Sequence, residues 1–135
     1  MNLVEKLLAA DRGEIEKLAT KEILSKQLSR ILGEPTKIKI QAVDSELFTA
    51  LSASGLDENG DVDYNKAFNT NSKIAAAGII EPDLKNEDLL NHLEVVTPAD
   101  AAKKLFKGEI NKISTEIAKL SGFDNEEETD KEVKN

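Results

Sequence analysis

The stretch TPADAAKKLFKGEINKISTEIAKLSGF, residues 97–123, carries the clearest structural pattern in the chain. Thr97 offers a capping hydroxyl, Pro98 stands at the first helical position and Asp100 adds a carboxylate to the first turn. This combination is typical of the start of an α-helix. Gly108 is expected to end the helix. The inward-facing apolar positions of this first helix are Ala102, Leu105 and Phe106.

The second half of the stretch predicts a longer amphipathic helix over residues 109–121. Its apolar side chains recur at helical spacing, at Ile110, Ile113, Ile117 and Leu120. Gly122 followed by Phe123 is typical of a left-handed C-cap with its hydrophobic contact. Two helices joined at a glycine also have the form of a helix-turn-helix, but the polar face of the second helix mixes acidic and basic residues, whereas DNA recognition needs mainly basic and amide side chains. We therefore favour two structural helices packed against each other.

One upstream segment predicts a β-strand. In TKIKIQA, residues 36–42, Ile38 and Ile40 alternate with polar side chains, as in a strand that is buried on one face. One strand cannot form a sheet. It must therefore pair with residues 20–24 of the same chain or with another chain, for example across a dimer.

The remaining segments indicate a mainly α fold, a small domain of about five or six helices with one short strand or hairpin. Residues 1–123 are expected to form this single domain, and residues 1–20 can pack on it, remain mobile or swap onto a neighbouring copy. Residues 124–135 carry six acids, two lysines and one valine, and we expect them to be a disordered acidic tail. Further helices are expected over 2–10, 14–32, 45–54, 64–77 and 87–92, with an extended alternative for 21–25.

Composition excludes several classes of function. The chain has 135 residues, 18 Lys and Arg against 26 Asp and Glu, and a net charge of -8. This charge disfavours binding to nucleic acids and to anionic membranes. There is no cysteine and only one histidine, so thiolate chemistry and sites that need two histidines are excluded. No signal peptide or membrane-spanning run is recognised, which indicates a cytoplasmic protein.

Two candidate sites lack the residues that their chemistry needs, so we expect no metal, cofactor or catalytic residue. Asp57, Asn59, Asp61 and Asp63 alternate as in an EF-hand loop. Counted from Asp57, however, Val62 replaces the required glycine and Phe68 replaces the bidentate glutamate. His92 ends a short helix and is better explained as a cap or a partly buried residue than as a base.

The segment GIIEPDLKNEDLLNHLEVVTPADAAKKLFKGEINKISTEIAKLSGF, residues 78–123, resembles the XkdN-like phage tail assembly chaperones. The shared features, in order, are an apolar connector, a Leu-rich short helix, the Thr97-Pro98 cap and the run into Gly122 and Phe123. The strand at 36–42 and its neighbours match more loosely, so the resemblance covers residues 20–123. It implies a non-catalytic protein of the host cytoplasm that is absent from the mature virion.

The resemblance also implies partners. Such a chaperone binds the tape measure protein, keeps it soluble and helps to recruit tail tube subunits, and it can have a frameshifted long form. Homo-oligomers are a further possibility that the sequence leaves open. The alternative is an acidic helical adaptor or regulatory binding protein of phage origin. The side chains expected to bind a partner are Leu105, Phe106, Ile110, Ile113, Leu7 and Leu8.

Overall fold

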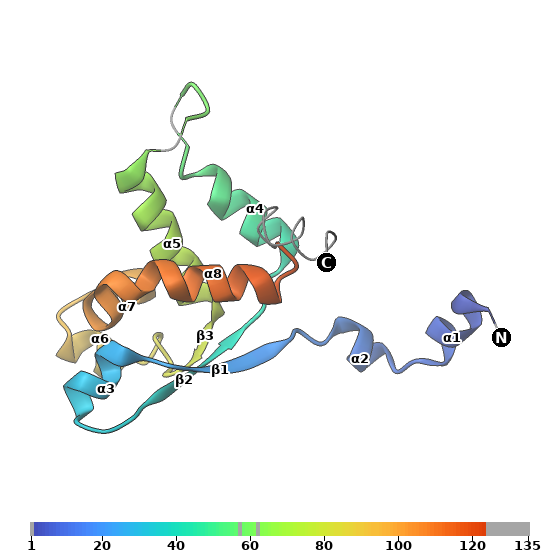
Figure 1. Ribbon diagram of the computed structural model, residues 1–135, viewed down its shortest axis with the longest axis horizontal. Helices are drawn as coiled ribbons and strands as arrows, with labels where there is room; N and C mark the ends of the chain where they lie inside the picture. Colours follow the sequence, from blue (N-terminus) through green and yellow to red (C-terminus); the bar gives the residue numbers. More distant parts are fainter. Residues whose placement is uncertain (1, 57, 62, 124–135) are drawn as a thin grey trace, which may run out of the picture.

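The computed structural model describes residues 2–56, 58–61 and 63–123 of the chain (Figure 1). Within these residues it contains eight α-helices, one short 3-10 helix and three β-strands. The mainly helical fold expected from the sequence is confirmed, with a three-stranded sheet where one strand or hairpin was expected. The predicted disordered tail, residues 124–135, lies outside the described residues.

The small sheet is built around β2 (Lys37–Gln41), which pairs antiparallel with β1 (Thr20–Leu24) on one side and β3 (Ile79–Glu81) on the other. Ile38 and Ile40 of β2 are buried beneath the helices, at 1% and 0% exposure. The predicted strand and its pairing with the preceding segment are confirmed. Both neighbours of β2 come from the same chain, so the pairing across a dimer that the sequence left open does not occur in this structure.

Residues 14–32, for which one helix was expected, belong to three elements: α2 (Arg12–Glu16), β1 and α3 (Lys26–Leu32). The extended alternative for the middle of this segment is the one observed. Pairing with β2 gives the backbone of β1 its hydrogen-bond partners, and Ser25 then starts α3 by accepting a hydrogen bond from the Leu28 N–H at 3.1 Å. Strand pairing therefore outweighs the local helical spacing.

The helical part is centred on α5 (Tyr64–Gly78), which packs against α7 (Pro98–Phe106) and α8 (Ile110–Leu120). The helices expected in these three regions are confirmed. α5 and α8 approach closely at Gly78, where an added Cβ would lie 2.5 Å from Cδ1 of Ile117. A glycine at this position therefore allows the contact between the two helices.

A short 3-10 turn, η1 (Lys107–Glu109), joins α7 to α8 in place of the simple bend expected at Gly108. Glu109 ties this turn to α3. Its carboxylate oxygens accept hydrogen bonds from the start of α3, from the Ser25 hydroxyl at 2.8 Å and the Lys26 and Gln27 N–H groups at 2.9 Å each. The carboxylate thus satisfies N–H groups that the helix itself leaves without partners.

The buried apolar side chains form one cluster that includes the sheet, α5, α7 and α8, with α4 (Ser45–Ala53) and α6 (Glu87–His92) at its margins. The first two helices, α1 (Leu3–Ala9) and α2, contribute no buried residue to it. They extend from the body as an arm that leads into β1 (Figure 1). We call residues 2–18 the N-terminal arm.

Candidate partner-binding surfaces

An open groove of about 410 Å³ lies between α4, α5 and α8. Its apolar lining includes the rings of Phe48 and Phe123, which stack with centroids 4.4 Å apart, together with Ile74 and Ala118. The lining also contains polar side chains, from Ser52, Thr70, Asn71, Ser114, Thr115 and Lys119. We call this feature the groove. Its mixture of apolar and polar lining suits an amphipathic segment better than a polar small molecule.

The groove is held open by contacts at both ends of α4. At its start, the Val43 N–H donates to the Ser121 hydroxyl at 2.8 Å, which links the chain before α4 to the end of α8. After its end, the Ser54 and Thr70 hydroxyls lie 2.9 Å apart and connect the α4–α5 turn to α5. The two contacts fix the separation of the helices that form the walls.

The end of α8 places Phe123 in the groove. Gly122 has a φ of 89° and turns the chain back, so that the Phe123 N–H donates to the Ala118 carbonyl at 2.8 Å. The left-handed cap expected at Gly122 is therefore confirmed. Its hydrophobic contact reaches Phe48 of α4, a residue distant in sequence.

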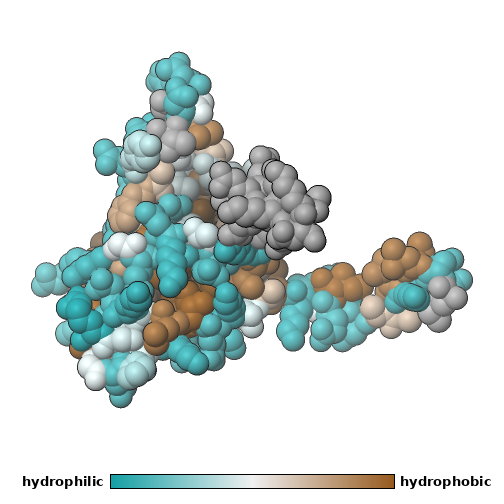
Figure 2. All heavy atoms as spheres, viewed as in Figure 1, coloured by the Kyte–Doolittle hydropathy of each residue, from teal (hydrophilic) through white to brown (hydrophobic). Residues whose placement is uncertain are grey.

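The second candidate surface is the N-terminal arm, whose apolar side chains are exposed among the residues that the structure describes. α1 presents an apolar face opposite Glu5 and Lys6, and Leu8 on that face is 80% exposed. Hydrophobic side chains are visible along the arm in Figure 2. The exposed large apolar side chains of the arm are Leu3, Val4, Leu7, Leu8, Ile15 and Leu18.

The side chains expected to bind a partner fall into two groups. Phe106, Ile110 and Ile113 are buried in the core at 0%, 0% and 2% exposure, where they contact the chain's own residues. Leu105 is partly buried, and Leu7 and Leu8 are exposed on the arm. Only the members of the second group are accessible in this structure, and their role in binding stays a prediction. The first group cannot touch a partner unless the core opens.

The groove was not among the expected sites. Its lining residues, such as Phe48, Ile74 and Phe123, are far apart in the sequence and meet only in the folded chain. The one sequence signal for it was the phenylalanine that follows Gly122. That signal indicated a capping contact but not the residue on the other side of it.

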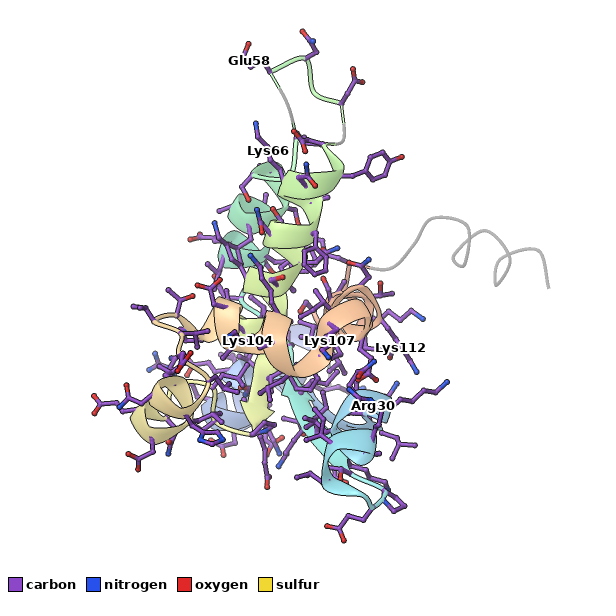
Figure 3. All side chains as sticks on the ribbon, turned by 90° about the vertical axis from the view of Figure 1, so that its left-hand side faces the viewer. Arg30, Glu58, Lys66, Lys104, Lys107 and Lys112 are labelled. Atoms are coloured by element: carbon purple, nitrogen blue, oxygen red, sulfur yellow. The ribbon has the colours of Figure 1, made fainter. Side chains whose placement is uncertain are left out.

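The exposed charges of the body include a group of basic side chains near the joint between α7 and α8. Figure 3 shows Lys104, Lys107 and Lys112 on one face, with Arg30 of α3 nearby. Lys104 is used within the chain, since its Nζ donates to the Leu93 carbonyl at 2.6 Å. These basic side chains therefore surround a structural joint and do not converge on a cavity.

α8 is also committed to the chain's own packing. Its apolar face is buried, and Asn111 on its polar face accepts a hydrogen bond from Asn71 at 2.9 Å. Glu116 pairs with Lys21 of β1 at 2.8 Å. This hydrogen bond lowers the pKa of the Glu116 carboxyl from its ordinary value of 4.5, and partial burial opposes the shift. Little of α8 is left to act as a recognition helix.

No group of three or more metal-binding side chains comes together within the described residues. Asp57 and Val62 of the calcium-like loop lie outside those residues. His92 is the last residue of α6, as expected, but it is exposed, so the expectation of partial burial is wrong. No helix in the described part of the chain is long and apolar enough to cross a membrane.

Comparison with known proteins connects this architecture to a family. A crystal structure of the protein YqbN has the same fold, with a TM-score of 0.56 and 16% sequence identity over 85% of this chain and 98% of that one. No curated protein matches the sequence. The profile of the family described as Phage XkdN-like tail assembly chaperone protein matches residues 4–134. The chain therefore belongs to the XkdN-like family of phage tail assembly chaperones.

Proposed function

We propose that this protein binds amphipathic helical segments of the tape measure protein, keeps that protein soluble in the host cytoplasm and helps to bring tail tube subunits to it. It does so without catalysis and leaves before the virion is complete. The observation that carries this proposal is the presence, in a chain of the tail assembly chaperone family, of an exposed apolar face on the N-terminal arm and of a groove in which Leu56 and Phe123 are 43% and 38% exposed.

The groove suits a helical client because its walls are themselves helices and its lining mixes aromatic and aliphatic side chains with hydroxyl and amide groups. Phe123, which is 38% exposed and stacks on the buried ring of Phe48, supplies an aromatic contact at one side. Polar groups such as Ser52 and Thr115 can interact with the polar face of the client. A small surface of this kind gives modest affinity, which allows release.

The N-terminal arm offers a second contact. Leu7 and Leu8 lie on one face of α1 and are 52% and 80% exposed. A helix as short as α1 is marginal in water by itself, so an apolar partner along this face would stabilise it. The arm and the groove can therefore bind separate segments of the client.

The test is co-expression with fragments of the tape measure protein encoded by the same phage. Fragments that bind should become soluble and co-purify with the chain. Ser52→Glu places a charge in the groove and should reduce recovery of the fragments, whereas Ala50→Glu, on an exposed position of the same helix outside the groove lining, should not. On the arm, Leu8→Glu should likewise reduce recovery of the fragments, and Ala9→Glu is its control and should not.

The proposal fails if no fragment becomes soluble with either the chain or a frameshifted long form. It also fails if the groove and arm variants recover as much fragment as their controls. In that case the alternative of an acidic adaptor for another protein becomes the better explanation.

A further inference from the structure

A group of exposed basic side chains surrounds the joint between α7 and α8. Lys104, Lys107 and Lys112 lie on one face of the body, with Arg30 of α3 nearby (Figure 3). Lys104 donates to a neutral carbonyl and therefore keeps its positive charge. The acid of the joint, Glu109, turns its carboxylate to the start of α3 instead. The surface around the joint is therefore basic, although the chain as a whole is acidic.

This positive charge continues along α8. Lys112, Glu116 and Lys119 follow one another at spacings of four and three residues, so they lie on one face of the helix. Lys21 of β1 pairs with Glu116 on that face at 2.8 Å. The hydrogen bond with Lys21 lowers the pKa of this carboxyl most, burial opposes the shift, and the charges of Lys119 and Lys112 lower the pKa further. Three lysines therefore gather around one carboxylate. We call the whole surface the basic face, formed by Lys21, Arg30, Lys104, Lys107, Lys112 and Lys119.

The chain itself contains a segment of the opposite charge. Residues 124–135, outside the described part of the chain, carry six acids and two lysines, a net charge of -4. Half of the net charge of -8 is therefore concentrated in these residues. Val133 is the one large apolar residue among them, so hydrophobic burial cannot hold the segment on the body. Electrostatic attraction is the interaction that its composition allows.

The segment starts within reach of the basic face. It follows Phe123, directly after the end of α8, and two lysines of the basic face lie on α8 itself. α8 has 11 residues and is therefore about 17 Å long. The acidic segment, fully extended, spans up to about 40 Å. It is long enough to return along α8 as far as Lys107.

We propose that residues 124–135 turn back along α8 and cover the basic face of the same chain. The first acids of the segment lie near Lys119 and Lys112, and its last acids lie near Lys107. The acidic remainder of the body repels the segment, which favours this face over others. A partner with an acidic surface then reaches the basic face only by displacing the segment. The proposal adds a regulated site to the body and is independent of how the groove or the arm binds a client.

The physical character of the contact sets how it is tested. Single exposed ion pairs contribute little, so the segment is held by the number of charges and not by any one pair. Such a contact is sensitive to salt, because the Debye length falls from about 30 Å at 0.01 M to about 3 Å at 1 M ionic strength. Apolar packing would show no such loss at high salt.

The experiment is paramagnetic relaxation enhancement on the full, isotope-labelled chain. The sequence has no cysteine, so Val133→Cys provides one defined site for a nitroxide. At low salt, the amide signals around Lys107 and Lys112 should weaken at least about twofold more than the signal of Lys66, and this difference should vanish at about 1 M salt. Lys66 is a suitable reference because it lies away from the basic face (Figure 3).

Variants of the body test which charges hold the segment. Lys107→Glu combined with Lys112→Glu reverses two charges of the basic face and should abolish the weakening at low salt. Lys6→Glu combined with Lys66→Glu changes the net charge equally at exposed positions outside the basic face, and should leave the weakening in place. Dispersed amide spectra of both double variants show that the body is folded.

A variant of the segment leaves the described body untouched. Glu126→Gln, Glu127→Gln and Glu128→Gln together remove three of its six negative charges and should reduce the weakening. The inference is overturned if signals near Lys66 weaken as much as those near Lys107, or if the weakening survives high salt or the reversal of the two lysines. It is also overturned if the signals of isotope-labelled chains without a nitroxide weaken when spin-labelled chains are added, since the segment then binds another copy. None of these results involves the tape measure protein, so this inference and the proposed function can fail separately.

Discussion

Removing the carboxylate of Glu109 should destabilise the whole fold, because this side chain connects the joint before α8 to the start of α3. It accepts hydrogen bonds from the Ser25 hydroxyl and from the N–H groups of Lys26 and Gln27. The donors lie more than 80 residues away in the sequence. Glu109→Ala would therefore release a long-range contact as well as a helix cap.

The size of the effect follows from the burial of the three bonds. The bonds from the Ser25 hydroxyl and the Gln27 N–H are partly buried, whereas the Lys26 bond is exposed and water can replace it. A hydrogen bond to a charged group contributes about 1.5–3 kcal/mol. Two such bonds at the lower end of that range give a loss of about 3 kcal/mol, or a fall in Tm of about 10 °C for a chain of this size.

Urea unfolding followed by circular dichroism measures this loss directly. Glu34→Ala is the control, since it removes the same charge from an exposed position. A double-mutant cycle of Glu109→Ala with Ser25→Ala should give a coupling of about 1 kcal/mol or more. If Glu109→Ala lowers stability by less than about 0.5 kcal/mol, or by no more than the control, the carboxylate does not hold α3 in place and the reasoning is wrong.

Three other changes test separate parts of the structure. Gly78→Ala should lower the free energy of unfolding by about 1–3 kcal/mol, because the new Cβ would lie 2.5 Å from Cδ1 of Ile117. This strain exceeds the roughly 1 kcal/mol that alanine gains over glycine in helix propensity. Unchanged stability in urea would show that α5 and α8 can separate at little cost. The Lys21–Glu116 pair lowers the pKa of Glu116, so it stabilises the fold above pH 4.5 and this contribution is lost as the pH falls through the lower folded-state pKa. Glu116→Gln should therefore make stability less dependent on pH in the acid range, and a variant with the parent's pH profile would contradict this. Calcium should leave Tm unchanged, because Phe68 stands where an EF-hand needs glutamate; a calcium-dependent rise would indicate a site that the spacing does not predict.

The elements that the sequence predicts best are those whose own residues decide their structure. α7 and α8 have caps at Thr97 and Gly122 and a regular apolar face, so their existence follows from local pattern alone. β1 does not. Its residues have helical spacing, and only the presence of β2 as a neighbour makes the strand the more stable state. Predicting β1 as a strand required its pairing with β2 to be known.

The same limit explains why the binding surface was harder to predict than the fold. An apolar face such as that of Phe106, Ile110 and Ile113 shows that a helix side is buried, but it does not show whether the chain or a partner buries it. In this structure the chain's own residues bury this face. On α1, an equally regular face around Leu7 and Leu8 is not buried by any of the residues that the structure describes. The local pattern is alike in both cases, and only the tertiary structure separates them.

The apolar face of the arm, which is exposed among the described residues, and the acidic composition of the chain have opposite effects on association. Exposed leucines on the arm favour contact with other molecules, including other copies of the chain. A net charge of -8 on a chain of 135 residues makes each additional copy less favourable, with a range set by the salt concentration. Without this charge, contact between exposed arms would meet less repulsion and association would be stronger. The net charge therefore limits association of the apolar arm, while Leu7 and Leu8 stay accessible to another molecule.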